Sequence, residues 1–484
     1  MIKFALSLLL AFLGGIDSFA SVSPLDYGLL DARDGVERFW ALYRAHSEAM
    51  RLGTGVDYSG VGDIQLTIPP NAKSIPLIKN TDFCGITIEV ENTCKDFQLF
   101  LMDYSLKEIF LSQDRLDGDD FRDVEDLQNG TRLLVMEDEN PWVKNRKGYS
   151  YGHIRRDIRL IENGRAKNKT VMPYGNSLTT KPRCWVVNTN NDQIIIENLN
   201  IERLATSTYK TFCMRVDGQN NVLITNIKIT TPWNTGMYGD GAISLHDCTN
   251  VRFEDVTIDG TYSLKDKYGY GIAIGNCWNV TFKRIKADAN WGVFCCNNLN
   301  TAHLEDCNVN RFDTHCYGRD FSFENCFLHD GGLMMSSVYG KISYKNCTFR
   351  DFDPICIRYE YNCFVPFDVE MKDCSMLASK KDKLIYMGRL TNELSDRPEL
   401  HVKNWPNLKI DGLRIIPENN IKTIYIYHVG GAVDKNIVVH NINNVNIRGL
   451  RIDGDVEFRL CTQRVSTAKR IKCKIQQSRV SSQF

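Results

Sequence analysis

The sequence predicts an all-β fold, a single-stranded parallel β-helix closed at its N-terminal end by a capping helix. Three observations support this prediction: one short motif recurs from residue 198 to residue 449, the text around it alternates apolar and polar residues, and an amphipathic helix precedes the repeats. Alternation with period two is typical of strands, whereas helical repeats would show a period near 3.6. We therefore expect a solenoid whose coils consist of short strands.

The recurring motif begins with a turn residue. Most turn positions hold Asn, Asp or Gly, the types that best tolerate left-handed backbone dihedrals, and Arg284 is the exception. Successive positions are 19 to 39 residues apart. A one-residue turn between two short strands explains both features. The turn residues are Asn198, Asn226, Asp255, Arg284, Asp306, Asn325, Asn346, Asp373, Gly412 and Gly449.

The residue after each turn is Val, Ile, Leu or Cys, which is the composition of a buried column. The chain has 17 Cys residues, an odd number, and free Cys packs as a small hydrophobe. We therefore predict mostly unpaired, stacked thiols, among them Cys307, Cys326, Cys347 and Cys374. The pairs to be tested for bridging are Cys84 with Cys94, Cys356 with Cys363, and Cys461 with Cys473.

The first twenty residues have the pattern of a secretory signal. Lys3 precedes an apolar run over residues 4–13, and small residues follow before a cleavage point near residue 20. This run is shorter than the roughly 20 residues that span a membrane, and no later segment is a candidate span. The sequence therefore predicts a secreted or periplasmic protein.

An amphipathic helix follows the signal. Asp34 is a suitable N-cap, Glu37 stands three residues later, and Gly53 is a suitable stop. The predicted apolar face is Phe39, Leu42, Tyr43 and Met50. A helix in this place would cover the exposed strand edges of the first coil.

From this helix onward, the chain resembles pectate-lyase-like proteins, which are right-handed parallel β-helices. The resemblance lies in DYG at residues 26–28, the helix, IQLTIPP at residues 64–70 and the coils with Asn turns, and it covers most of residues 24–460. It implies right-handed coils. Arg-Ile-Lys at residues 284–286 and 470–472 lacks the companion motifs of polygalacturonase-type hydrolases, so the resemblance implies no particular mechanism.

Five segments follow from these patterns. They are a signal peptide (1–20), a cap with the amphipathic helix (21–60), early coils with long loop and hairpin insertions (61–190), regular coils that carry a groove (191–460) and a basic tail (461–484).

Charge limits the range of partners. The 484 residues include 59 basic and 59 acidic side chains, and a nucleic-acid partner would need clustered excess Lys and Arg. The acidic stretch within residues 112–130 is best explained as a solvated loop; a calcium site is the alternative, but EF-hand spacing is absent. We predict no cofactor and no nucleic-acid partner.

The distribution of loops predicts a groove. The three shortest intervals, of 22, 19 and 21 residues, leave the central coils bare, whereas long insertions lie on both sides. Function usually resides on loops held by a rigid scaffold. A groove along a rod suits a linear polymer, so the predicted partner is a polysaccharide or oligosaccharide.

Aspartates border this groove. Asp313, Asp330 and Asp353 occupy successive coils, and Asp240 lies in the same predicted column. Stacked strands would separate neighbours by about 5 Å and next neighbours by about 10 Å, which brackets the carboxylate distances of glycosidases. The alternative is ordinary turn chemistry in Asp-Gly and Asp-Pro pairs.

A second set of candidates could support β-elimination on a uronate polymer. This reaction needs a base, for which we consider His315, and a cation that neutralises the substrate carboxylate, for which we consider Arg358. Surface salt bridges are the alternative explanation for such residues. The remaining candidates for substrate binding are Arg215, His246, Glu360, Arg389, Trp291, Tyr238 and Tyr270.

The sequence therefore predicts a carbohydrate-active enzyme. The leading hypothesis is hydrolysis of glycosidic bonds by an Asp pair drawn from Asp313, Asp330 and Asp353. The second is β-elimination by His315 and Arg358, and the third is a non-catalytic, glycan-binding or adhesive rod.

Overall fold

The structure is a computed structural model. It describes residues 21–143, 153–170, 182–188, 192–204, 206–207, 209, 211–231, 241–260, 269–287, 291–335, 338–358, 367–387, 405–418, 421–430, 441–461 and 471–476. The predicted signal at residues 1–20 lies outside these ranges.

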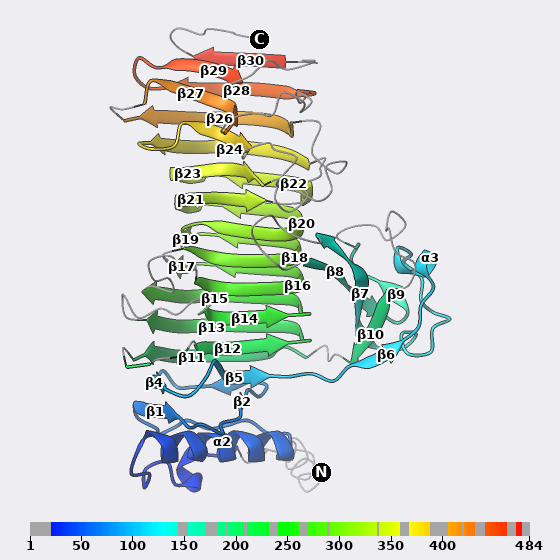
Figure 1. The fold of residues 1–484 in the computed structure, drawn as a ribbon, viewed down its shortest axis with the longest axis vertical. Coiled ribbons are helices and arrows are strands. Elements are labelled where there is room, and N and C mark those ends of the chain that lie inside the picture. The colour runs from blue at the N-terminus through cyan, green and yellow to red at the C-terminus, as the bar shows by residue number, and fades with distance from the viewer. Residues whose placement is uncertain are drawn as a thin grey trace, which may run out of the picture.

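The chain forms a rod of stacked coils, as predicted (Figure 1). Strands of successive coils pair in parallel and in register, so that in β13 and β15 Val222 lies opposite Val251 and Ile227 lies opposite Val256. The strands of the rod are β1 (Ile64–Ile68), β2 (Ile75–Pro76), β3 (Thr81–Asp82), β4 (Thr87–Asn92), β5 (Phe97–Met102), β11 (Ile194–Arg203), β12 (Thr211–Asp217), β13 (Asn220–Thr231), β14 (Gly241–His246), β15 (Thr249–Gly260), β16 (Tyr270–Lys283), β17 (Lys286–Ala287), β18 (Gly292–Glu305), β19 (Asn308–Val309), β20 (Phe312–Glu324), β21 (Phe327–Met335), β22 (Val338–Lys345), β23 (Thr348–Ile357), β24 (Phe367–Ala378), β25 (Lys383–Met387), β26 (Asn407–Pro417), β27 (Thr423–Val429), β28 (Val445–Ile452), β29 (Glu457–Cys461) and β30 (Ile471–Gln476).

The predicted turn column is confirmed. All ten turn residues have φ between 51° and 85°, the left-handed region in which Asn, Asp and Gly cost least. Their side chains also bond between coils, since Asn226 Nδ2 donates to Asn198 Oδ1 at 2.6 Å. The exception, Arg284, makes two 2.7 Å hydrogen bonds to Asp255, one coil earlier. A charge-assisted pair therefore replaces the amide ladder at this turn.

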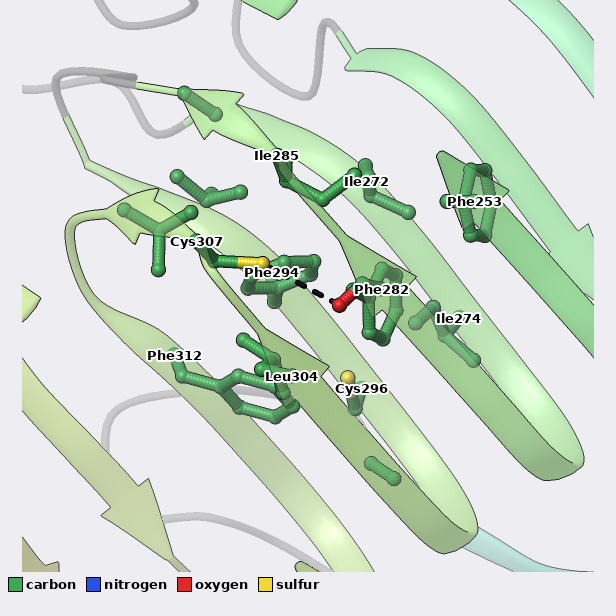
Figure 2. Packing of buried hydrophobic residues seen from close by; sticks show 14 of the residues in the cluster. Phe253, Ile272, Ile274, Phe282, Ile285, Phe294, Cys296, Leu304, Cys307 and Phe312 are labelled. Carbon is green, nitrogen blue, oxygen red and sulfur yellow. Dashed lines mark hydrogen bonds between the residues drawn. The ribbon is translucent and has the colours of Figure 1, made fainter. Parts of the chain in front are cut away.

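The predicted thiol column is buried. Cys307, Cys326, Cys347 and Cys374 are each at most 4% exposed, and the thiol of Cys307 donates to the carbonyl oxygen of Phe282 at 3.4 Å (Figure 2). Phenylalanine rings stack beside this column, with Phe253 and Phe282 5.2 Å apart between ring centroids. The interior is thus a continuous stack of apolar side chains.

The disulfide candidates divide into two groups. Cys84 and Cys94 are both free thiols, so the bridge considered for them is absent. Cys363 and the side chain of Cys473 lie outside the described part of the chain, so the other two pairs stay untested.

The N-terminal helix α2 (Gly35–Leu52) covers the first coil, after the short 3-10 helix η1 (Pro24–Tyr27). The Asp34 carboxylate accepts hydrogen bonds from the backbone N–H groups of Val36 and Glu37 at 3.0 and 2.9 Å. The predicted apolar face was wrong at one position, because Met50 is 58% exposed. Small alanines complete the buried face instead, which consists of Phe39, Ala41, Leu42, Ala45, His46 and Ala49.

A five-stranded antiparallel sheet lies beside the rod (Figure 1). It contains β6 (Lys107–Ile109), β7 (Thr131–Val143), β8 (His153–Glu162), β9 (Arg165–Ala166) and β10 (Arg183–Asn188), with helix α3 (Gln113–Leu116) in the same insertion. The insertion contacts the rod through Lys169, whose carbonyl oxygen accepts a hydrogen bond from Asn300 at 2.6 Å. Among the described residues, no helix is both long and apolar enough to cross a membrane.

Candidate functional site

Among the described residues, one sheet of the rod carries most of the predicted site residues. We call it the site face; it consists of β12, β14, the first parts of β16, β18 and β20, and the last parts of β21 and β23. Register places one outward residue per coil in a single column. In order along the rod, this column is Arg215, Ser244, Ala273, Cys295, Asp313, Met334 and Cys356.

Small side chains separate the two charged residues of this column. Arg215 and Asp313 are four coils apart, or about 19 Å at ~4.8 Å per strand layer. Ser244 and Ala273 lie between them. The column therefore links two charged clusters, which we call the Asp313 cluster and the Arg215 cluster.

The Asp313 cluster is centred on a fully buried carboxylate, since Asp313 is 0% exposed. Arg311 Nε donates to its Oδ1 at 2.9 Å, and the Tyr270 hydroxyl donates to its Oδ2 at 2.7 Å. His315 Nε2 lies 3.7 Å from Oδ2, and Arg358 Nη1 lies 3.9 Å from Oδ1. The two residues predicted to act together in elimination thus meet at one carboxylate.

A β-bulge places His315. Between β18 and β20, Cys296 pairs with Thr314, but the next pair is Asn297 with Cys316, so His315 is the extra residue. Bulges re-aim side chains and are frequent next to active sites. The imidazole lies between two groups: its Nδ1 is 3.4 Å from the sulfur of Cys295, and its Nε2 is 3.3 Å from the Tyr270 hydroxyl.

Aromatic residues wall the cluster. Trp291 Nε1 donates to the Tyr270 hydroxyl at 2.8 Å, and the Arg311 guanidinium lies 4.1 Å from the centroid of the Trp291 ring. Burial and the charge of Asp313 raise the pKa of Tyr270, which therefore keeps its proton. The cluster is rigidly connected because each polar group contacts another.

Electrostatics set the protonation states of the cluster. Burial would raise the pKa of Asp313, but His315, Arg311 and Arg358 outweigh burial and hold this pKa below its usual value. Burial would lower the pKa of His315, but Cys295 and Asp313 outweigh it and raise this pKa to about 9. Near neutral pH, three cationic side chains therefore surround one carboxylate.

The Arg215 cluster contains two buried carboxylates. Arg215 Nε donates to both oxygens of Asp217, at 2.9 and 2.7 Å, and the Tyr104 hydroxyl donates to Asp247 at 2.6 Å. Burial raises the pKa of Asp217 to about 6 despite Arg215, and burial also raises the pKa of Asp247. Burial, Arg215 and Arg156 lower the pKa of the predicted binding residue His246 to about 4.

The predicted stack of aspartates was wrong. Asp313 lies opposite Met334 in the next coil, four positions after Asp330, and Asp353 lies opposite Gly332, two positions after Asp330. Asp353 is buried, and Lys381 Nζ lies 2.8 Å from its Oδ2. Burial raises the pKa of Asp353.

Asp330 lies away from both clusters. Its side chain is 64% exposed and contacts His329 Nδ1 at 3.0 Å. It lines a pocket of about 430 Å³ on a different sheet of the rod. The other lining residues include Asp259, Lys286, Asn308, Phe327, His329 and Arg350.

Other predicted binding residues fall outside the described part of the chain. They are Asp240, Tyr238, Glu360 and Arg389. No group of three or more His, Cys, Asp or Glu side chains within the described ranges is arranged to hold a metal ion.

Sequence reasoning missed several members of these clusters. Arg311 stands two residues before Asp313, a spacing that places both on one side of a strand and could have indicated the pair. Cys295 is hidden among many cysteines in the sequence. Asp217 ends β12 and Asp247 follows β14. No local pattern predicts that Tyr104 lies beside Asp247, since that contact spans 143 positions.

No protein-family model matches the sequence, and no curated protein is similar to it. Solved structures are similar in fold. The tailspike protein gp49 from Pseudomonas phage LKA1 matches with TM-score 0.51 and 13% identity over 93% of this chain and 81% of that chain. The gp54 tailspike of Acinetobacter baumannii bacteriophage AP22, solved with A. baumannii capsular saccharide, matches with TM-score 0.52 and 12% identity over 91% and 77%. At such identities the likeness concerns the fold alone. The chain is a right-handed parallel β-helix, the fold of the pectate-lyase-like proteins that its sequence resembles.

Proposed function

We propose that this protein binds an anionic carbohydrate polymer along the site face and cleaves it by β-elimination at the Asp313 cluster. The observation that carries the proposal is the meeting of His315 and Arg358 at the Asp313 carboxylate, 3.7 and 3.9 Å away. The capsular saccharide bound by the AP22 tailspike supports a carbohydrate ligand for this fold.

The charge balance supports an anionic polymer. Arg311, Arg358 and protonated His315 exceed the charge of Asp313, so the cluster carries a positive surplus that attracts a substrate carboxylate. The Trp291 and Tyr270 rings lie beside these charges, and we assign them to packing against a sugar ring.

Each residue has a defined role in the proposed reaction. Arg358 neutralises the carboxylate of a uronate, which acidifies the neighbouring C–H bond. His315 removes that proton in its neutral form. Tyr270 keeps its own proton, because burial and Asp313 raise its pKa, so the protonated His315 returns the abstracted proton to the departing glycosidic oxygen. Because the pKa of His315 is about 9, elimination should increase as the pH rises through this value.

A panel of uronate polysaccharides tests the proposal. Digestion above pH 9 should produce the ultraviolet absorbance of unsaturated uronates, and Arg358→Ala and His315→Ala should each reduce the initial rate by about 10²-fold or more. The matched control is Asp411→Asn, an exposed carboxylate on another sheet, which should keep the full rate. Reducing ends without absorbance would contradict elimination.

Hydrolysis is the second candidate, and the Arg215 cluster favours it. The pKa of Asp217, raised to about 6, lets this carboxyl hold a proton near neutral pH, and Asp247 follows directly after the residue that pairs with Asp217 in the next coil. Acid–base hydrolysis requires a carboxyl that can hold a proton and donate it to the leaving group. Reducing ends that disappear in Asp217→Asn would support it. Binding without either product would support an adhesive rod.

We further propose that the protein acts outside the cytoplasm, on the basis of the signal pattern in residues 1–20. Sequencing the N-terminus of the mature protein tests this proposal, and a mature chain that retains Met1 would contradict it.

A further inference from the structure

We infer that Cys295, His315 and Asp313 form a nucleophilic array that removes acyl esters from the carbohydrate bound at the site face. The carbohydrate part of this inference rests on the proposed function, but the thiol chemistry does not. Elimination makes no use of Cys295, whose sulfur is nevertheless 3.4 Å from His315 Nδ1.

The geometry is that of an activated nucleophile. A nucleophilic side chain needs a base within hydrogen-bond reach, and the base needs a third group that orients it. Here Cys295 lies on one side of the His315 ring, and on the other side Nε2 faces Tyr270 at 3.3 Å and Asp313 at 3.7 Å. The Tyr270 hydroxyl donates to Asp313, so it links the ring to the carboxylate.

The strands fix this array. Cys295 and Asp313 lie opposite each other in β18 and β20, and the bulge adds His315 on the same outward side. Cys295 is half-buried, unlike the fully buried thiol of Cys296 beside it. The buried thiols of the Cys307 column donate to backbone carbonyl oxygens. Cys295 differs from them because its thiol lies beside a histidine ring.

The charge state suits a thiol nucleophile. Asp313 and Cys295 keep His315 protonated below about pH 9, against its burial. Tyr270 also contacts this ring, and the cations Arg311 and Arg358 lie at the Asp313 carboxylate beside it. An imidazolium is a poor base for elimination near neutral pH, but it stabilises a thiolate next to it. Elimination by neutral His315 and ester cleavage by Cys295 therefore belong to different pH ranges.

The proposed reaction balances as follows. The Cys295 thiolate attacks the ester carbonyl carbon, the bond from that carbon to the sugar oxygen breaks, and the His315 imidazolium gives its proton to this oxygen. A thioester and a free sugar hydroxyl result. Neutral His315 then takes a proton from water, the hydroxide attacks the thioester, and a carboxylic acid leaves as the thiolate and the imidazolium form again. Water is the only co-substrate.

Thiol labelling tests the array without any carbohydrate. Wild-type protein is treated with limiting iodoacetamide near neutral pH, and labelled peptides are quantified by mass spectrometry, with the exposed thiol of Cys84 as internal standard. Relative to Cys84, Cys295 should react about tenfold faster in the wild type than in His315→Ala. Equal relative rates in the two proteins would overturn the inference.

A small ester tests the acyl transfer. p-Nitrophenyl acetate should give a burst of p-nitrophenol, with one acetyl group on the Cys295 peptide, and Cys295→Ser should lose both while Cys84→Ser keeps them. A burst that persists in Cys295→Ser would contradict the inference. Acetylation of the wild-type protein only at residues other than Cys295 would also contradict it. Because neither assay contains a polysaccharide, failure here is distinct from failure of the proposed function.

Discussion

The two charged clusters of the site face adjoin the same outward column but differ in how strongly neighbouring cations stabilise their carboxylates. At the Asp313 cluster, three cationic side chains surround one carboxylate, whose pKa falls below its usual value. At the Arg215 cluster, Asp217 and Asp247 are both buried, and their pKa values rise. Burial opposes ionisation in both places, so the number of adjacent cations decides the outcome.

The largest expected effect comes from removing the central carboxylate. Asp313→Ala leaves Arg311, His315 and Arg358 without their shared counter-charge in a buried place, which should lower the free energy of unfolding by about 3–5 kcal/mol. Urea denaturation measures this loss. The control, Asp330→Asn, changes a side chain that is 64% exposed and should stay within about 0.5 kcal/mol of wild type. Equal losses in the two variants would show that Asp313 does not balance the charge of the three cations.

The Arg215 cluster should respond to pH through Asp217. Its pKa rises from 3.8 in the unfolded chain to about 6 in the folded protein, so its contribution to stability is complete below pH 3.8 and is lost as the pH rises through about 6. Asp217→Asn removes this titration. Its unfolding free energy relative to wild type should therefore improve by about 2–2.5 kcal/mol between pH 4 and pH 7. A constant difference across this range would show that Asp217 has an ordinary pKa.

His315 should cause a similar loss of folding stability, but at higher pH. Its pKa is raised from 6.5 to about 9, so its stabilising contribution is present below pH 6.5 and disappears as the pH rises to about 9. Relative to His315→Gln, wild-type protein should lose up to about 3 kcal/mol over this interval. Chemical denaturation at several pH values measures it. A loss confined to lower pH would contradict the assigned charge state.

The smallest expected effect is at the contact between the insertion and the rod. Tyr104→Phe removes one hydroxyl that donates to Asp247 at 2.6 Å, and loss of a hydrogen bond to a carboxylate should cost about 1.5–3 kcal/mol. Because Tyr104 is only about half-buried, we expect the lower end of this range. Thermal unfolding measures the change, and a larger loss than in Asp313→Ala would reverse the predicted order.

The repeat could be predicted from the sequence because the same few residue types recur at equivalent positions of successive coils. The turn residues from Asn198 to Gly449 need left-handed dihedrals, and few residue types provide them cheaply. The thiol column could be predicted for a similar reason, since Cys307 and Leu413 occupy equivalent buried places. Both features depend only on local backbone conformation and on burial.

The clusters could be predicted only in part. His315 and Arg358 were expected to act together, and both contact Asp313. The aspartate stack failed because the strand partners of Asp313 and Asp353 are Met334 and Gly332, four and two positions after Asp330. Asp-Gly and Asp-Pro pairs occur in turns as well as in strands, so matching them by eye does not fix which residues of neighbouring strands lie opposite each other.

The stacked thiols make the rod vulnerable when it opens. Cys307 and Cys326 lie in adjacent coils, where strand spacing separates Cα atoms by about 4.8 Å, within the range that a disulfide can bridge. Tight packing keeps oxidants out of the intact interior. If a coil unfolds locally in an oxidising medium, a disulfide can form between its thiol and that of the neighbouring coil before the native packing returns. The rate of local unfolding, more than the equilibrium stability, would then determine the lifetime of the folded protein in that medium.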